Sequence, residues 1–418
     1  MLLWFRCKNC YSFADNGDED KGVGIAMIAS DQPNLKVPDD YEEPEYSYSI
    51  IRNGLHIRQV TSIYGANGSG KSNIFKAITS MFENISGIGC KLNGEPFTRD
   101  GTLKDKPIVC EISFCLPSEL GYDEYRYGYE ITDKSILTEW LTKRILGTND
   151  NFEDIFFREG NNIRFGKGDY ATVEPFKATL EQSTDILFLR LAGRTRVEPF
   201  SKIYKWCLSS IPPNIFSDEG MKRQIEAVAE RIEKDENFRL EFLDFLKKFD
   251  PCVEDVITTD TMPDMTLSLL IKQTVHNAPE GTKPYRYVSI FRESHGTQRI
   301  ASIYLLLADA WNKGGLVLVD ELDMRLHPHV LRELIKRFRH KDNKSAQLIF
   351  SSHNTATLNS RNMRSDEIYF VKKDNKGHSI INRLSDYTHN GKKLRLDMHF
   401  DEMYLSGRFG AIPEEFVL

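Results

Sequence analysis

One short stretch constrains the fold of this chain more than any other. Residues 65–72 read GANGSGKS, after an apolar run over 55–64 and before a helical pattern over 73–82. Glycines at this spacing let the backbone turn tightly and bring successive N–H groups round one centre. The following helix points its positive end at the same centre. The stretch therefore predicts a phosphate-binding loop, and the strand and helix patterns beside it argue against a chance glycine-rich turn.

Two side chains of this loop have expected roles toward a nucleotide. We expect Lys71 to reach the β- and γ-phosphates and the Ser72 hydroxyl to bind Mg²⁺. ATP and Mg²⁺ are therefore the predicted cofactors. The predicted nucleotide-binding residues of this segment are Gly65, Asn67, Gly68, Gly70, Lys71, Ser72 and Asn73.

A second motif ends an apolar run much later in the chain. Residues 316–319 read LVLV, and Asp320 and Glu321 follow them directly. We expect Asp320 to hold Mg²⁺, directly or through water, and Glu321 to act as general base on the attacking water. Two acids at a strand end could equally form surface ion pairs. The loop at 65–72 favours the catalytic interpretation.

The rest of the chain alternates between strand and helix patterns. Short β-type runs recur over 107–146 and predict an antiparallel meander. Helical patterns dominate over 175–250, and strands and helices alternate again after that. We therefore expect an α/β fold in three parts: an N-terminal lobe at 1–146, a mainly helical insertion at 147–260 and a C-terminal lobe at 261–418.

The charge balance limits how the chain could bind nucleic acid. Its 418 residues include 55 Lys and Arg against 61 Asp and Glu, a net charge of −6, which excludes a protein that coats nucleic acid by bulk charge. Two local basic groups remain. The first group comprises Lys336, Arg337, Arg339, Lys341 and Lys344, and the second comprises Lys392, Lys393 and Arg395. A solvated helix end is the simpler explanation of the first group, and contact with nucleic acid is the alternative.

Apolar runs and cysteines indicate the compartment. No run approaches the roughly 18–20 apolar residues that cross a bilayer, and the first residues lack the apolar stretch of a signal peptide. The seven cysteines are typical of reduced thiols. Cys7 and Cys10 are expected to be two thiols on a strand rather than zinc ligands, because no second pair follows at suitable spacing. We expect a cytoplasmic protein without membrane contact.

Further motifs resemble the ABC-type ATPases. Residues 293–299, ESHGTQR, open a helix just before the strand that ends at Asp320, and they resemble the ABC signature. Asp323 matches the D-loop position, and His353 matches the switch histidine. The tripeptide LHP at 326–328 resembles the SMC/RecF/OLD-like branch rather than membrane transporters.

This resemblance implies a P-loop ABC-ATPase head, a RecA-like core with an antiparallel β subdomain. It implies a head-to-head dimer in which Ser294, Gly296 and Asp323 contact the nucleotide across the interface. The implied catalytic residues are Lys71, Glu321 and His353, and the implied metal ligands are Ser72 and Asp320.

The two ends of the chain carry a finer resemblance. Residues 5–13 resemble the first strand of the same branch, although Cys10 replaces the usual aromatic residue. Residues 404–413, YLSGRFGAIP, resemble stand-alone bacterial AAA ATPases (AAA_15 and AAA_21) of the AbiL type. Those are often encoded beside a separate nuclease or RloB-like partner in phage-defence loci. Because the stretch after His353 is too short for the Toprim nuclease domain of OLD proteins, we expect any effector chemistry on another chain.

One departure from the ABC pattern concerns the glutamine that usually follows the first helix and helps to hold Mg²⁺. The sequence has no Gln between Asn73 and Glu181. Glu111, on an expected strand, is a candidate substitute. Two alternatives remain: hydrolysis is slow, or Ser72 and Asp320 hold Mg²⁺ alone.

Three functions fit these observations. The first is an ATP-hydrolysing sensor or clamp that controls a separately encoded effector in antiphage defence or abortive infection. The second is an SMC/RecF-like DNA-repair ATPase that binds duplex DNA. The third is a non-catalytic scaffold that ATP holds together.

Overall fold

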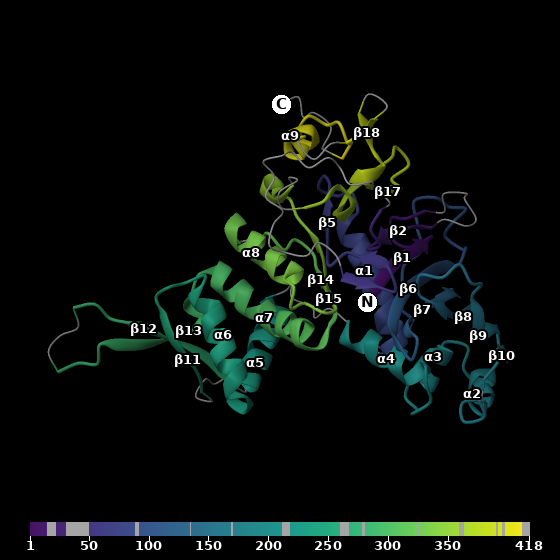
Figure 1. Cartoon of the computed structure of the whole chain (residues 1–418), viewed down its shortest axis with the longest axis horizontal. Coiled ribbons are helices and arrows are strands. Elements are labelled where there is room, and N and C mark those ends of the chain that lie inside the picture. The colour runs from purple at the N-terminus through teal and green to yellow at the C-terminus, as the bar shows by residue number, and fades with distance from the viewer. Residues whose placement is uncertain are drawn as a thin grey trace. The chain divides into compact units, whose positions relative to one another are not determined.

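The computed structural model forms two units, which we describe separately (Figure 1). The first comprises Met1–Ile211, Lys313–Leu322 and Leu334–Leu418, and the second comprises Pro212–Asn312 and Asp323–Glu333. The structure describes residues 1–14, 22–30, 50–87, 92–133, 135–168, 170–210, 218–259, 267–277, 281–324, 326–358, 363–389, 392–394 and 398–411.

A five-stranded sheet is the centre of the first unit. Its order is β14 (Gly315–Val319), β15 (Ala346–Ser351), β5 (Val60–Tyr64), β16 (Ile368–Lys373) and β17 (Ser379–Arg383). The first four strands are parallel, and β17 is antiparallel to β16. All residues of β5, β14 and β15 are buried, as the apolar runs in the sequence predict for a sheet covered on both faces. The loops that follow these three strands therefore lie at one edge of the sheet.

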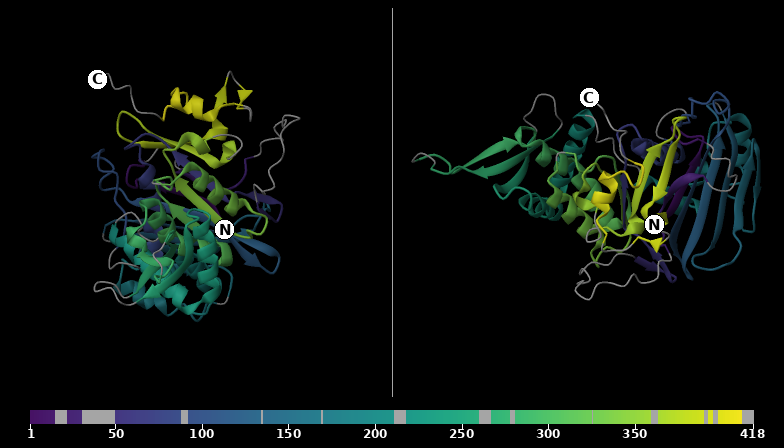
Figure 2. Two further views of the ribbon diagram at one scale, coloured as in Figure 1. Left: turned by 90° about the vertical axis from the view of Figure 1, so that its left-hand side faces the viewer. Right: turned by 90° about the horizontal axis from the view of Figure 1, so that it is seen from above.

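The second sheet of this unit is antiparallel, and its long strands run side by side in Figure 2 (right). Its order is β10 (Asn162–Phe165), β9 (Glu153–Glu159), β8 (Ile136–Ile145), β7 (Gly121–Ile131), β6 (Ile108–Ser118), β1 (Leu2–Lys8) and β2 (Val23–Ala26). Helices α1 (Lys71–Ser86) and α4 (Phe200–Ser209) pack against it. Trp206 of α4 stacks on Phe114 of β6, with 4.4 Å between the ring centroids, and meets Phe82 of α1 edge-on, with 5.8 Å between the centroids. These rings join the antiparallel sheet to the helix that follows the P-loop.

Short elements complete the first unit. They are β3 (Ile50–Arg52), β4 (Leu55–Ile57), α2 (Phe176–Gln182), α3 (Phe188–Ala192), β18 (Thr388–His389), β19 (Lys392–Lys393), α9 (Phe400–Leu405) and the 3₁₀ turns Thr355–Thr357, Ser365–Glu367 and Leu384–Asp386.

The second unit combines helices with a three-stranded antiparallel sheet. Its elements are α5 (Asp218–Lys234), α6 (Glu236–Lys247), β11 (Val253–Thr259), β12 (Ser268–Thr274), β13 (Tyr285–Ser289), the 3₁₀ turn Ile290–Arg292 and α7 (His295–Lys313); α8 (Pro328–Arg339) begins in it. Asp235 separates α5 from α6 and caps α6 by accepting a hydrogen bond from the Phe238 amide at 3.1 Å. The apolar side of this helix pair is buried at Ile225, Val228, Ile232, Phe238, Phe242 and Leu246.

The α/β fold class with its antiparallel β subdomain is confirmed. The structure differs from the expected element pattern in three places. Residues 153–165, assigned to the helical insertion, form β9 and β10 and extend the antiparallel sheet. Residues 23–26 form β2 and residues 253–259 form β11, and neither strand was predicted. The boundaries of the three expected domains stay a prediction, since the two units are defined by compactness and not by independent folding.

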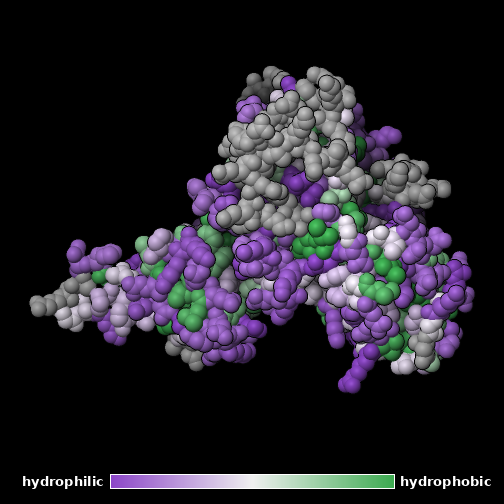
Figure 3. All heavy atoms as spheres, viewed as in Figure 1, coloured by the Kyte–Doolittle hydropathy of each residue, from purple (hydrophilic) through white to green (hydrophobic). Residues whose placement is uncertain are grey.

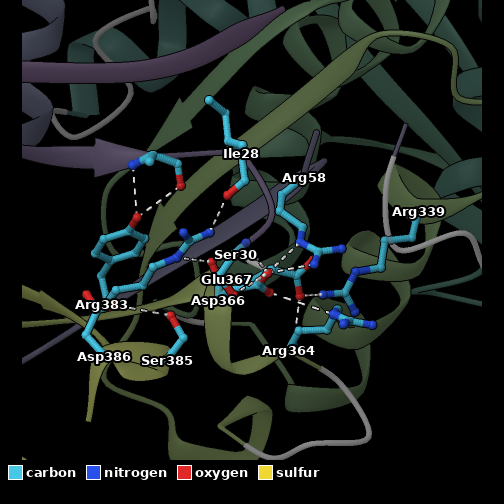
Figure 4. A network of polar contacts seen from close by, with 12 residues as sticks. Ile28, Ser30, Arg58, Arg339, Arg364, Asp366, Glu367, Arg383, Ser385 and Asp386 are labelled. Atoms are coloured by element: carbon cyan, nitrogen blue, oxygen red, sulfur yellow. Dashed lines mark hydrogen bonds and ion pairs between the residues drawn. The ribbon is translucent and has the colours of Figure 1, made fainter. Parts of the chain in front are cut away.

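A buried ion network lies at the amino ends of β5 and β16 (Figure 4). Arg58 pairs with Asp366 at 2.6 Å, and Arg339 pairs with Glu367. Burial alone would raise the pKa of Asp366, but Arg58 and Arg383 outweigh burial and that pKa lies below its usual value. Because Arg339 is only 3% exposed and sits in this network, assigning it to a solvated basic helix end was wrong.

The coloured part of the face drawn in Figure 3 is mostly hydrophilic, with hydrophobic side chains in small separate groups. Among the described residues, none of the helices combines the length and the apolar composition needed to cross a bilayer.

Candidate nucleotide site

The loop between β5 and α1 has the backbone that its glycines predict. Gly65, Gly68 and Gly70 have φ of +156°, +74° and +109°. A Cβ at Gly65 would lie 2.3 Å from the carbonyl oxygen of Val371, and one at Gly70 would lie 2.1 Å from Oγ of Ser379. Any larger residue at these two positions would collide with β16 or β17, so the close approach of these strands requires glycine.

Lys71 is the first residue of α1, and its side chain folds back over the loop. Its Nζ donates hydrogen bonds to the carbonyl oxygens of Gly65 at 2.8 Å and Ala66 at 3.0 Å. The side chain is buried, whereas Asn67, Gly68 and Ser72 are exposed. The ammonium is therefore held inside the loop, with the loop's outer rim open to solvent.

Two serines that the sequence did not single out brace the loop. Oγ of Ser379, on β17, donates to the carbonyl oxygen of Ser69 at 2.6 Å and also contacts Oγ of Ser12 at 2.7 Å. The Asn73 side-chain amide donates to the same Ser12 hydroxyl at 2.7 Å. The side chain of Asn73 thus contacts Ser12, and the role of Asn73 toward a nucleotide stays a prediction.

One hydroxyl of the neighbouring strand contacts both acids after β14. Ser351, the last residue of β15, donates from Oγ to the Asp320 carboxylate, and the same oxygen accepts the Glu321 amide at 2.7 Å. Glu321 has φ of +48°, an uncommon conformation for a residue with a side chain. The bond to Ser351 holds this turn, so Ser351 positions both acids. In the sequence, Ser351 stands out only as a polar residue at the end of an apolar strand.

His353 follows β15 by two residues and is exposed. The amide of Ser352 bonds the carbonyl oxygen of Ile63 on β5 at 3.1 Å, which fixes the segment before His353 beside the P-loop strand. The structure therefore brings Lys71, Asp320, Glu321 and His353 to the same edge of the five-stranded sheet.

The signature residues and Asp323 lie in the second unit. Ser294 caps α7: its Oγ accepts the Thr297 amide at 3.1 Å and contacts the Thr297 hydroxyl at 2.9 Å. Ser294 is exposed and Gly296 lies in the first turn of this 19-residue helix. The helix start thus has the N–H groups that an anion requires, whereas its pairing with a P-loop stays a prediction.

The donor set at the sheet edge suits Mg²⁺. A serine hydroxyl and a carboxylate, from Ser72 and Asp320, are hard oxygen ligands, and Mg²⁺ usually takes its remaining ligands from water and phosphate. No cluster of three or more His, Cys, Asp or Glu side chains that could hold a metal occurs in the described part of the chain. Glu111 accepts hydrogen bonds from Arg6 at 2.5 Å and Trp140 at 3.0 Å, so its carboxylate is already engaged in the antiparallel sheet.

The sequence comparison decides the family. Residues 60–359 match the family described as "AAA domain, putative AbiEii toxin, Type IV TA system". The matched range includes both the P-loop and the acid pair. The chain belongs to this family. Membership of this AAA family confirms the expected relationship to AAA ATPases, and a partner of the RloB type stays a prediction. No curated protein matches the chain in sequence.

Solved structures similar to this AAA-domain chain include three SMC heads. The SMC head domain from Thermotoga maritima has 15% identity and a TM-score of 0.40, covering 91% of this chain and 98% of that one. An SmcHead bound to the C-winged helix domain of ScpA has 14% identity and a TM-score of 0.42, covering 91% and 96%. An Smc head with an extended coiled coil, bound to the C-terminal domain of ScpA from Pyrococcus furiosus, has 14% identity and a TM-score of 0.40, covering 98% and 99%.

Proposed function

We propose that the chain binds ATP with Mg²⁺ and hydrolyses it. The observation that carries this proposal is the arrangement at the carboxyl edge of the parallel sheet. There the loop holding Lys71 follows β5, and Asp320 and Glu321 follow β14, which β15 separates from β5. Membership of an AAA family supports the same conclusion.

Each side chain has one task in this proposal. Lys71 exchanges its loop carbonyl partners for the β- and γ-phosphates, and the loop N–H groups bind the same phosphates. Ser72 and Asp320 hold Mg²⁺, which neutralises charge on the phosphates when bound. Glu321 takes the proton of the attacking water, and His353 contacts the γ-phosphate.

The finer part of the proposal is control of another protein. Two copies dimerise head to head, and Ser294, Gly296 and Asp323 of one complete the nucleotide site of the other. The exposed start of α7 supports this, because a long helix presents its positive end there. ATP-driven closure then controls a separately encoded nuclease or RloB-like effector in the cytoplasm, in antiphage defence or abortive infection. The family description, which names a putative toxin of a toxin–antitoxin system, fits such a role.

A Glu321→Gln variant tests the hydrolytic step. The amide keeps the shape of the carboxylate but cannot take a proton, so ATP should bind and turnover should stop. Phosphate release and sedimentation in Mg-ATP measure both consequences, and we expect an ATP-dependent dimer. Wild-type turnover by this variant would contradict the general-base role of Glu321.

DNA binding is the competing function and needs its own measurement. Because Arg339 is buried, only Lys336, Arg337, Lys341 and Lys344 of that basic group remain as candidates for contact with DNA. The smaller group weakens the case for DNA binding. Binding of duplex DNA with a steep dependence on salt would favour it. ATP-dependent assembly without measurable hydrolysis would favour the scaffold.

A further inference from the structure

We propose that the C-terminal segment, Phe400–Ala411, is part of the nucleotide site and that Tyr404 is a positioning residue for the P-loop. This inference rests on the proposed function, because it concerns the same loop. The segment comprises α9 and the turn that follows it, and it belongs to the first unit together with β5.

An aromatic cluster joins this segment to the strand that leads into the P-loop. Tyr404 stacks on Phe370 of β16 at 5.3 Å and meets Tyr64 edge-on at 6.2 Å. Phe409 stacks on the same Phe370 ring at 4.6 Å. Since Tyr64 is fully buried and directly precedes Gly65, these rings fix the point at which the loop begins.

A polar contact extends this packing into the loop itself. The backbone of Gly65 interacts with the Tyr404 hydroxyl, which partly offsets the rise that burial causes in the Tyr404 pKa. The same hydroxyl donates to the carbonyl oxygen of Ala411 at 3.4 Å. Because the Gly65 carbonyl oxygen is one of the two that hold the Lys71 ammonium, Tyr404 acts on Lys71 through this one residue.

The cluster also reaches the segment that carries His353. The hydroxyl of Tyr64 bonds Oγ1 of Thr357 at 2.6 Å, and Thr357 lies in the turn just after His353. The start of the P-loop is therefore held from two sides, by the C-terminal segment and by the turn after β15.

Contacts of its own keep the C-terminal segment in place. Tyr387 donates from its hydroxyl to the carbonyl oxygen of Phe409 at 3.1 Å, and the Arg408 amide bonds the Met403 carbonyl oxygen at 3.1 Å. On the same short helix, Leu405 is 62% exposed. Leu405 therefore offers a matched control, since its truncation leaves the cluster intact.

The test compares Tyr404→Phe, Tyr404→Ala and Leu405→Ala in the full chain. Isothermal titration with Mg²⁺ and a non-hydrolysable ATP analogue gives affinity and stoichiometry separately, and thermal unfolding reports stability. Tyr404→Phe keeps the ring and removes the hydroxyl that interacts with the Gly65 backbone, so we expect a Kd weaker by about three- to tenfold at unchanged stoichiometry. Tyr404→Ala, if it folds, should weaken binding further, and Leu405→Ala should match the wild type.

The outcomes separate this inference from the function on which it rests. A Tyr404→Phe variant with wild-type Kd would overturn the positioning role while leaving ATP binding intact. Reduced stoichiometry at unchanged Kd would also overturn it, because that pattern means a smaller folded fraction rather than a displaced loop. A wild-type chain that does not bind the analogue would overturn both.

Discussion

Replacing Ser351 by alanine removes one hydroxyl that serves two partners. The Asp320 carboxylate loses a donor and the Glu321 amide loses its acceptor, both beside buried strand ends. A hydrogen bond to a charged group contributes about 1.5–3 kcal/mol, and a buried amide without a partner costs about 1–3 kcal/mol. If the two losses add, we expect the free energy of unfolding to fall by roughly 2.5–6 kcal/mol.

The larger consequence concerns turnover. Glu321 adopts φ of +48°, and without the bond to Ser351 its backbone is free to relax and carry the carboxylate away from the water. If about 2 kcal/mol of the lost stabilisation appears as a higher activation free energy of hydrolysis, kcat drops roughly thirtyfold. Phosphate release at saturating Mg-ATP measures kcat, and titration with the non-hydrolysable analogue measures binding, which we expect to change little.

A threonine at the same position distinguishes positioning from packing. Ser351→Thr keeps the hydroxyl but adds a methyl group at a fully buried site, which costs about 1–3 kcal/mol of stability. It should therefore be destabilised yet recover most of the turnover. Equal kcat in the alanine variant and the wild type would refute the reasoning, as would a threonine variant no faster than the alanine variant.

Three further changes test other parts of the molecule. Lys71→Ala should abolish nucleotide binding in calorimetry, and wild-type affinity would reject the P-loop assignment. Ser294→Arg should leave ATP binding by the monomer intact and stop turnover; mixed with Lys71→Ala it should regain some activity, because one site of each mixed dimer is intact. No recovery in dimers shown by mass to be mixed would count against shared sites. Arg58→Met should destabilise the fold by about 3–5 kcal/mol, since Asp366 keeps a buried charge without that partner. The folded-state pKa of Asp366 is lowered, so its contribution to stability is present above the ordinary carboxyl pKa and is lost as pH falls through the lowered value. In Arg58→Met that loss should begin at higher pH in acid titrations followed by circular dichroism.

Local patterns were enough to predict the parts of the site that lie within one stretch of chain. The P-loop between β5 and α1 and the acid pair after β14 depend on neighbours in sequence, and the structure has both where the sequence predicts them. Ser351 and Tyr404 could not be found this way. Their roles depend on which strands are adjacent and on how a distant segment packs, and one serine or tyrosine carries no periodic signal.

The errors have similar causes. Arg339 belongs to a run of basic residues that looks solvated, and its ion pair with Glu367, 28 positions later, lies in the interior. Residues 153–159 carry charges at both ends, which hides a strand whose centre is buried. Pairing with β8 stabilises this strand, and that partner is visible only in the folded chain.

The buried ion network gives the five-stranded sheet two unequal edges. At the amino edge, Arg58 and Arg339 each form a buried ion pair, and such pairs tolerate little displacement before the desolvated charges lose their partners. At the carboxyl edge, hydrogen bonds of neutral hydroxyls such as those of Ser351 and Ser379 help to hold the loops, and such bonds can be exchanged for bonds to a ligand. The sheet is therefore stiff at one end and compliant at the other. Nucleotide binding should change hydrogen exchange in the loops after β5, β14 and β15 and leave the amides around Arg58 unaltered.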